Sequence, residues 1–185
     1  MNECLHDLSA LFRTKERIKL LRTTLSLPVC TVKQVTTRTG LSKGLVSQYL
    51  ALLEHEGLLE RINRKYQLKI CPLTSALKRL LNVDLVSTVF KKPSWSRGIG
   101  IYGSWADGTN TDESDLDLFI FSETLPSGIM IAEVERDVSR ALSREVHVLV
   151  LTPEKITGMK KSDEPFYQSF MKQSITLAGD PYDSS

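Results

Sequence analysis

The chain has 185 residues, of which 41% are apolar and 25% charged, with three cysteines and a net charge of +2 at pH 7. This composition is typical of a protein with a buried core, and the length suffices for one medium domain or two small ones. No run approaches the roughly 18 apolar residues that a membrane-spanning helix requires, and residues 1–17 lack the features of a secretory signal. Cys4, Cys30 and Cys71 are far apart and form no Cys-x-x-Cys motif. This spacing argues against a disulfide framework or a zinc ribbon and favours a cytoplasmic protein without a membrane partner.

Charge is distributed unevenly between two parts of the sequence. Residues 1–70 contain 12 Lys and Arg against 6 Asp and Glu, a net charge of +6, whereas residues 71–185 contain 12 against 16, a net charge of −4. Such an asymmetry indicates two domains with different partners, the first of which is suited to a polyanion. We therefore predict one domain over residues 1–70, a connecting helix and linker over 71–94, and a second domain over 95–185.

The first 70 residues have the pattern of three helices followed by a hairpin. Apolar residues at helical spacing predict a helix from Lys15 to about Ser26. Thr31 and Gln34 fit a capping box that opens a second, short helix, and Gly40 supplies the turn after it. Ser42 then caps a third helix, and two strand-like runs follow it over residues 58–62 and 65–69. Together these elements predict a small α+β domain.

Two helices joined by a Gly turn, followed by a hairpin with a basic tip, resemble a winged helix-turn-helix over roughly residues 14–70. The most telling stretch is GLSKGLVSQYLALLEHEGLLER, residues 40–61, which is similar to the recognition helix and wing of many prokaryotic regulators. This resemblance implies binding of double-stranded DNA, with the third helix in the major groove. The residues expected at base edges are Ser42, Lys43, Gly44, Ser47 and Gln48. Those expected to contact phosphates from the wing are Arg61, Asn63, Arg64 and Lys65.

Two further expectations follow for this domain. The basic residues could instead form a solvated face of a protein-interaction module, because winged helices serve both purposes. A homodimer is also expected, since a dimer with two-fold symmetry matches the two half-sites of a palindromic DNA site.

The rest of the chain alternates between helices and strands. Residues 73–90 have a helical pattern, and Lys91-Lys92-Pro93-Ser94 is the expected hinge. A buried strand over residues 98–102 is followed by a polar turn and a second strand from Asp115 to Phe121. The remaining pattern predicts a helix over 128–144, a strand over 146–151, a helix that starts at 152–154 and a helix over 166–174. This alternation predicts an α/β or α+β domain.

The most specific signal in the chain is Gly103-Ser104 followed by Asp115-Leu116-Asp117. A glycine directly after a strand lets backbone N–H groups approach a phosphate, and the serine hydroxyl adds a donor. Because side chains alternate along a strand, both aspartates share one face with Phe119 and Phe121, opposite to Leu116, Leu118 and Ile120. Two carboxylates close together suit a magnesium ion that also holds nucleotide phosphates. The alternative is a polar hairpin whose acids only solvate the turn.

This pattern resembles the DNA polymerase beta-like nucleotidyltransferase superfamily, and its Ser-Asp-x-Asp-Leu form, residues 114–118, resembles the minimal nucleotidyltransferase branch. The resemblance covers about residues 75–180. It implies an α/β nucleotidyltransferase fold with a small mixed sheet, in which Gly103 and Ser104 bind a nucleoside triphosphate and Asp115 and Asp117 hold Mg²⁺, in a site that could take two metal ions. The implied reaction transfers a nucleoside monophosphate and releases pyrophosphate.

The third acid of that family's site is where this sequence departs from the pattern. By register, His147 stands where the acid is expected on the neighbouring strand. Glu145 lies two residues earlier on the same face and is the candidate to replace the acid as a catalytic residue beside Asp115 and Asp117; the alternative is a surface charge at the entry of the strand. His147 could accept a proton, ligate a metal or serve structure alone, although magnesium prefers oxygen. Trp105 and Asp107 could flank a nucleotide, with packing as the alternative for Trp105.

Together these features predict two domains, a DNA-binding winged helix followed by a magnesium-dependent nucleotidyltransferase-type domain. Such a protein would transfer a nucleotide to a protein or small-molecule acceptor, regulate transcription, or do both. Members of the minimal branch often act as antitoxins beside a small helical toxin of the HEPN family, so the resemblance implies a toxin-like partner. The alternative is a transcriptional regulator whose nucleotidyltransferase-like domain only binds nucleotide or is inactive.

Overall fold

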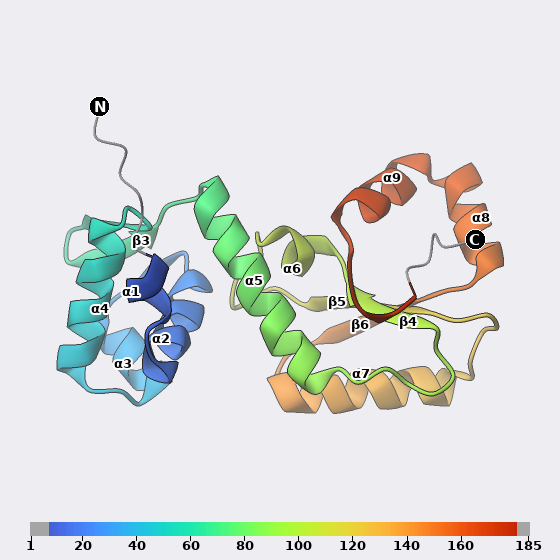
Figure 1. Ribbon diagram of the computed structural model, residues 1–185, viewed down its shortest axis with the longest axis horizontal. Helices are drawn as coiled ribbons and strands as arrows, with labels where there is room; N and C mark the ends of the chain where they lie inside the picture. The colour runs from blue at the N-terminus through green and yellow to red at the C-terminus, as the bar shows by residue number, and fades with distance from the viewer. Residues whose placement is uncertain (1–7, 181–185) are drawn as a thin grey trace. The chain divides into compact units, whose positions relative to one another are not determined.

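A computed structural model describes residues 8–180 and divides the chain into two compact units, Met1–Lys78 and Arg79–Ser185. The division falls within α5 (Pro72–Val89), and each unit has a sheet of its own (Figure 1). None of the helices among residues 8–180 combines the length and apolar character needed to cross a bilayer.

The first unit packs short helices against a three-stranded antiparallel sheet of order β1-β3-β2. Its helices are α1 (Leu8–Phe12), α2 (Lys15–Leu25), α3 (Val32–Thr39) and α4 (Lys43–His55). Its strands are β1 (Val29–Cys30), β2 (Leu59–Ile62) and β3 (Lys65–Leu68). The three predicted helices and the hairpin are thus present, whereas α1 and β1 were not expected from the sequence.

Local chemistry explains where these helices begin and end. The Thr31 backbone N–H donates to Gln34 Oε1 at 2.9 Å, and Thr31 Oγ1 accepts from the Gln34 N–H at 3.2 Å, which confirms the capping box at the start of α3. Gly40 ends α3 in the left-handed conformation, and Ser42 Oγ caps α4 by accepting from the Leu45 N–H at 3.4 Å. The fully buried face of the unit includes Leu20, Leu21, Val46, Leu50 and Leu53.

The second unit has a mixed four-stranded sheet of order β6-β5-β4-β7, in which β5 and β6 are parallel and the other pairs antiparallel. This confirms the mixed sheet that the sequence predicts. The strands are β4 (Gly98–Ile101), β5 (Leu116–Phe121), β6 (Val146–Leu151) and β7 (Ile175–Gly179). The helices besides α5 are α6 (Gly103–Asp107), α7 (Gly128–Leu142), α8 (Pro153–Ser162) and α9 (Glu164–Gln173).

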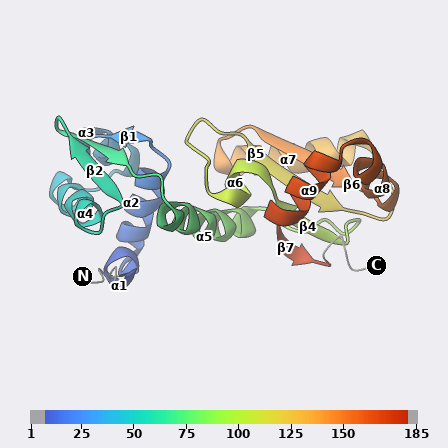
Figure 2. The same ribbon diagram turned by 90° about the horizontal axis from the view of Figure 1, so that it is seen from above.

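Helices cover both faces of this sheet, with α7 on one side and α8 and α9 on the other (Figures 1 and 2). Leu116, Leu118 and Ile120 of β5 belong to the core cluster that includes Val138 of α7. Phe119 and Phe121 belong to a separate cluster with residues of α8 and α9. The predicted alternation along β5 is therefore confirmed. Because Asp117 shares the parity of Phe119, it faces the α8 and α9 side of the sheet.

The polar segment that follows β4 differs from the expected turn. It contains the five-residue helix α6, which starts at Gly103 and ends where Gly108 adopts φ +72°. Left-handed glycines at both ends allow the chain to enter and leave a short helical turn abruptly. Strand β5 begins at Leu116, one residue later than predicted, so Asp115 is the last residue of the loop.

Candidate functional site

The turn after β4 and the start of β5 lie in direct contact. The Tyr102 backbone N–H donates to the Asp117 carbonyl at 3.1 Å. Gly103 has φ +63°, and a Cβ at this position would lie 2.7 Å from Asp117 Oδ2, closer than real Cβ contacts. Glycine is therefore required here for both its conformation and its lack of a side chain. The structure brings the predicted phosphate-binding turn and the predicted metal-binding pair together.

The two aspartates have different environments. Asp115 has 52% of its side chain exposed, whereas Asp117 is half-buried. Burial raises the pKa of Asp117 above its ordinary value, and the Asp115 charge raises it further, while His147 acts in the opposite direction. A bound cation would relieve both the burial cost and the repulsion of this pair.

His147 and Glu145 lie beside the aspartates. The parallel register pairs His147 of β6 with Asp117 of β5. His147 Nε2 is 3.7 Å from Asp115 Oδ2 and 3.6 Å from Glu145 Oε1. Glu145 directly precedes β6, has 69% of its side chain exposed, and its carbonyl accepts the Leu116 N–H at 3.0 Å. The structure thus gathers Asp115, Asp117, Glu145 and His147 at one end of the sheet.

The chemistry of the acid pair fits a divalent cation. Among residues 8–180, no group of three or more His, Cys, Asp or Glu side chains is placed to hold a metal ion. Asp115 and Asp117 nevertheless supply two carboxylates next to a turn from which a side chain is excluded. Mg²⁺ takes carboxylate, phosphate and water oxygens, so two protein carboxylates are a sufficient protein contribution. The imidazole of His147 is a poorer ligand for this ion.

Arg144 fixes the loop that carries Asp115, a role that the sequence analysis missed. Its Nη1 donates to the Asp112 carbonyl at 3.1 Å and also to the Ser114 carbonyl. Its guanidinium lies 5.1 Å from the centroid of the Trp105 ring, within cation–π range. Burial lowers the pKa of Arg144, while Asp112 and Asp115 act to raise it. A basic residue just before a strand carries no local signal of such a contact.

Asn82 of α5 supports the other end of this loop. Its Nδ2 donates to the Trp105 carbonyl at 2.8 Å and to Asn110 Oδ1 at 2.9 Å. Trp105 itself is only 3% exposed and lies within the core cluster that includes Leu116. Trp105 therefore packs, and the hypothesis that its ring flanks a nucleotide is wrong. Asp107 is half-buried in α6.

The residues predicted to contact DNA all lie on the surface of the first unit. Ser42, Lys43, Ser47 and Gln48 are exposed at the start and along one side of α4. A Cβ on Gly44 would meet no atom within 4 Å. Exposed positions on the hairpin are held by Arg61, Asn63, Arg64 and Lys65. Asn63 and Arg64 adopt φ +48° and +64°, which gives the tight turn between β2 and β3.

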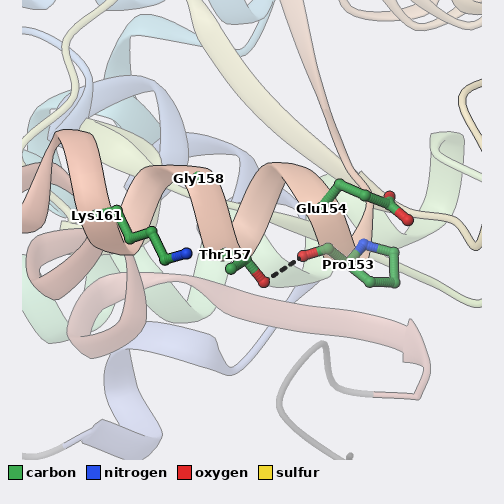
Figure 3. Close-up of a pocket in the computed structure, with 5 residues that line it drawn as sticks. All are labelled: Pro153, Glu154, Thr157, Gly158 and Lys161. Atoms are coloured by element: carbon green, nitrogen blue, oxygen red, sulfur yellow. Dashed lines mark hydrogen bonds between the residues drawn. The ribbon is translucent and has the colours of Figure 1, made fainter.

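A depression of about 480 Å³ lies on α8, and none of the predicted site residues lines it (Figure 3). It is lined by Pro153, Glu154, Thr157, Gly158 and Lys161. The Thr157 hydroxyl donates to the Pro153 carbonyl at 2.9 Å, so that side chain is used within the helix.

The profile of the family described as Polymerase beta, Nucleotidyltransferase matches residues 84–177, 94 of the 185 residues. This span contains the predicted phosphate-binding turn at Gly103 and Ser104, the acid pair, Glu145 and His147. No curated protein matches the chain.

Solved structures of toxin–antitoxin systems also match the chain at low similarity. One is the tri-AMPylated HEPN toxin of Shewanella oneidensis in complex with MNT antitoxin, with 16% identity over 55% of this chain and 73% of that chain, at a TM-score of 0.37. Others are a mutant of the toxin–antitoxin MntA-HpeT (17%, 55% and 76%, TM-score 0.41) and a toxin–antitoxin with AMP-PNP (20%, 55% and 73%, TM-score 0.37). Similarity at this level transfers no activity or partner to this chain.

Proposed function

Because the chain belongs to the polymerase beta nucleotidyltransferase family, we propose that its second unit binds a nucleoside triphosphate with Mg²⁺ and transfers the nucleoside monophosphate to a protein or small-molecule acceptor. The observation that carries the proposal is the contact between Gly103 and Asp117, where a Cβ would lie 2.7 Å from the carboxylate. This close contact supports a site in which the nucleotide phosphates lie directly beside the acid pair.

Each residue of the site has a proposed role. Gly103 and Ser104 bind the phosphates through backbone N–H groups and the serine hydroxyl. Asp115 and Asp117 hold the cation, which when bound neutralises phosphate charge. The acceptor hydroxyl oxygen bonds to the α-phosphorus, the bond to the bridging oxygen breaks, and pyrophosphate leaves. Glu145 takes the hydroxyl proton, since its exposed carboxylate can turn toward an acceptor that approaches from solvent.

The double variant Asp115→Asn with Asp117→Asn tests the metal assignment. Asparagine keeps the size of each side chain but removes both charges, so magnesium-dependent nucleotide binding should be lost while the fold is retained. Calorimetric titration with ATP and Mg²⁺, with circular dichroism as a check of the fold, measures both. Magnesium-dependent binding by the folded double variant would sink the assignment. A matched control is Asp137→Asn, an exposed aspartate of α7 outside the acid pair.

For the first unit, we propose a winged helix-turn-helix that binds double-stranded DNA. Three exposed basic side chains support it: Lys43 at the start of α4, and Arg64 and Lys65 on the β2–β3 hairpin. Lys43→Ala or Arg64→Ala should weaken binding to a duplex in a mobility-shift assay. Each lost phosphate contact should also reduce the slope of log affinity against log salt by about 0.9. If neither variant changes the mobility of a bound duplex, the protein-interaction alternative gains.

A second candidate function is a DNA-binding regulator whose nucleotidyltransferase domain binds nucleotide without transferring it. The observation that favours it is that His147 pairs with Asp117 across the parallel strands, at a position where the sequence resemblance implies an acid. In that case ATP and Mg²⁺ should bind while no labelled nucleotide reaches any acceptor. The acceptor that the sequence resemblance implies is a small helical toxin-like protein, and transfer of label to such a protein would favour the enzyme.

A further inference from the structure

A chain of aromatic rings connects the core of the second unit to the phosphate-binding turn. Phe119 of β5 and Phe170 of α9 have ring centroids 5.3 Å apart in an edge-to-face arrangement. Phe170 lies 5.5 Å from Tyr102, the residue before Gly103, and 6.3 Å from Phe166. Phe166 and Tyr102 are 6.4 Å apart and nearly perpendicular, at 82°. These separations are those at which aromatic pairs attract one another.

Exposure increases sharply along this chain. Phe119 is 0% exposed, Phe170 4% and Phe166 38%. Phe170 fills the contact between the sheet and α9, so core packing accounts for it. Phe166 stays exposed although the rings of Tyr102 and Phe170 lie against it, so core packing does not account for this residue in the same way. A ring that is both supported and exposed is suited to stack on a flat ligand.

The position of this ring relative to the acid pair follows from Tyr102. Asp117 lies on the same face of β5 as Phe119, which is the face that α9 covers. The Tyr102 backbone N–H donates to the Asp117 carbonyl at 3.1 Å. Tyr102 therefore contacts Phe166 through its ring and Asp117 through its backbone. Phe166 is therefore an exposed aromatic residue that contacts the residue directly before Gly103.

We propose that Phe166 is the platform on which the base of the bound nucleoside triphosphate stacks. The inference rests on the proposed function, because it needs phosphates held at Gly103, Ser104 and the acid pair. Stacking is tolerant of base identity since every base has a π-face. The site should therefore accept all four nucleoside triphosphates and prefer purines moderately for their larger rings.

The test compares ATP with inorganic triphosphate, which shares the phosphates but lacks the base and sugar. Calorimetric titration of the full chain with Mg²⁺ should give ATP an affinity about 10-fold higher than that of triphosphate, within the range expected for one stacked base. Phe166→Leu should remove most of that advantage and leave the triphosphate affinity unchanged. Phe166→Tyr should keep it, because the ring remains. Ile129→Ala, at an apolar side chain of α7 that is 73% exposed, is the matched control and should change neither affinity.

The outcomes separate the two proposals. Triphosphate binding with no advantage for ATP, or an ATP affinity that Phe166→Leu leaves intact, would overturn the stacking platform while the nucleotide site stands. Failure of the wild-type chain to bind either ligand would overturn the nucleotide site and the platform with it. Loss of triphosphate affinity in a folded Phe166→Leu variant would also contradict the proposal, because the ring would then support the phosphate turn rather than the base.

Discussion

A side chain at Gly103 would occupy the space that the Asp117 carboxylate fills, so we expect both stability and nucleotide affinity to respond to a substitution at this glycine. Gly103→Ala introduces a Cβ 2.7 Å from Oδ2 at a residue with φ +63°. The strain should cost about 1 kcal/mol of stability, the cost of a left-handed alanine. Displacement of the carboxylate should lower magnesium-dependent ATP affinity at least about 10-fold. Titration of the folded variant checks this, and unchanged affinity would mean that the close approach serves the fold alone.

The pKa of Asp117 predicts a pH-dependent stability. Burial raises this pKa above 3.8, so the native state holds the proton more tightly than the unfolded chain and loses stability as pH rises through the interval between the two values. Asp117→Asn has no proton to lose at this position, so it does not lose stability as pH rises. In the absence of divalent cations it should be more stable than the wild type at neutral pH, by up to about 1 kcal/mol, and the gain should disappear below the ordinary pKa.

Urea unfolding between about pH 3 and about pH 7.5 measures this difference in the free energy of unfolding. A gain that is independent of pH, or a loss of stability at neutral pH, would contradict the account of the Asp117 environment. Adding Mg²⁺ should stabilise the wild type and leave Asp117→Asn less affected, because a ligand of the native state alone shifts the unfolding equilibrium.

Strand β4 lies between strands β5 and β7, and its glycines leave room for both neighbours. A Cβ on Gly100 would lie 2.2 Å from the Ile175 carbonyl and 2.3 Å from the Phe119 ring. Gly100→Ala should therefore destabilise the second unit by about 1–3 kcal/mol or more, as overpacking does. Gly158→Ala in α8 is the matched control, since a Cβ there meets nothing within 4 Å. It should stabilise the helix by up to about 1 kcal/mol. Thermal unfolding compares the two, and equal effects would contradict the packing argument.

The elements also show which features local sequence can predict. The capping box at Thr31, the alternation along β5 and the third strand over residues 146–151 depend on neighbouring residues, and the structure has all of them. The short elements β1 and α6 carry too few residues for a periodic signal.

The contacts of the site depend on distant residues and were predicted less well. Arg144 and Asn82 act on a loop 28 to 32 residues away in the chain, which no local pattern reveals. The sequence left two alternatives open for Trp105, because an aromatic residue beside a predicted phosphate-binding turn looks the same in sequence whether it packs or binds. Its burial against the sheet decides the matter. Glu145 and His147 lie side by side, with Oε1 and Nε2 3.6 Å apart, so the sequence register alone could not separate their roles.

The two units are separately compact, and their net charges have opposite signs. Residues 1–70 have a net charge of +6 and residues 71–185 a net charge of −4. We expect substitutions in one unit to leave the binding function of the other intact. Asp115→Asn with Asp117→Asn should shift a DNA duplex as the wild type does, and Lys43→Ala with Arg64→Ala should keep the wild-type affinity for ATP. Loss of both functions in either folded variant would indicate coupling between nucleotide and DNA.

We propose that the second unit contains a working nucleotide site despite His147. Calorimetric titration of the wild-type chain with ATP, GTP, CTP and UTP, each with and without Mg²⁺, is the experiment that tests this site. We expect binding that requires Mg²⁺ and that extends to all four nucleotides, with purines bound more tightly. Absence of binding by any of them would contradict it, and the protein would then be a DNA-binding regulator on a nucleotidyltransferase scaffold.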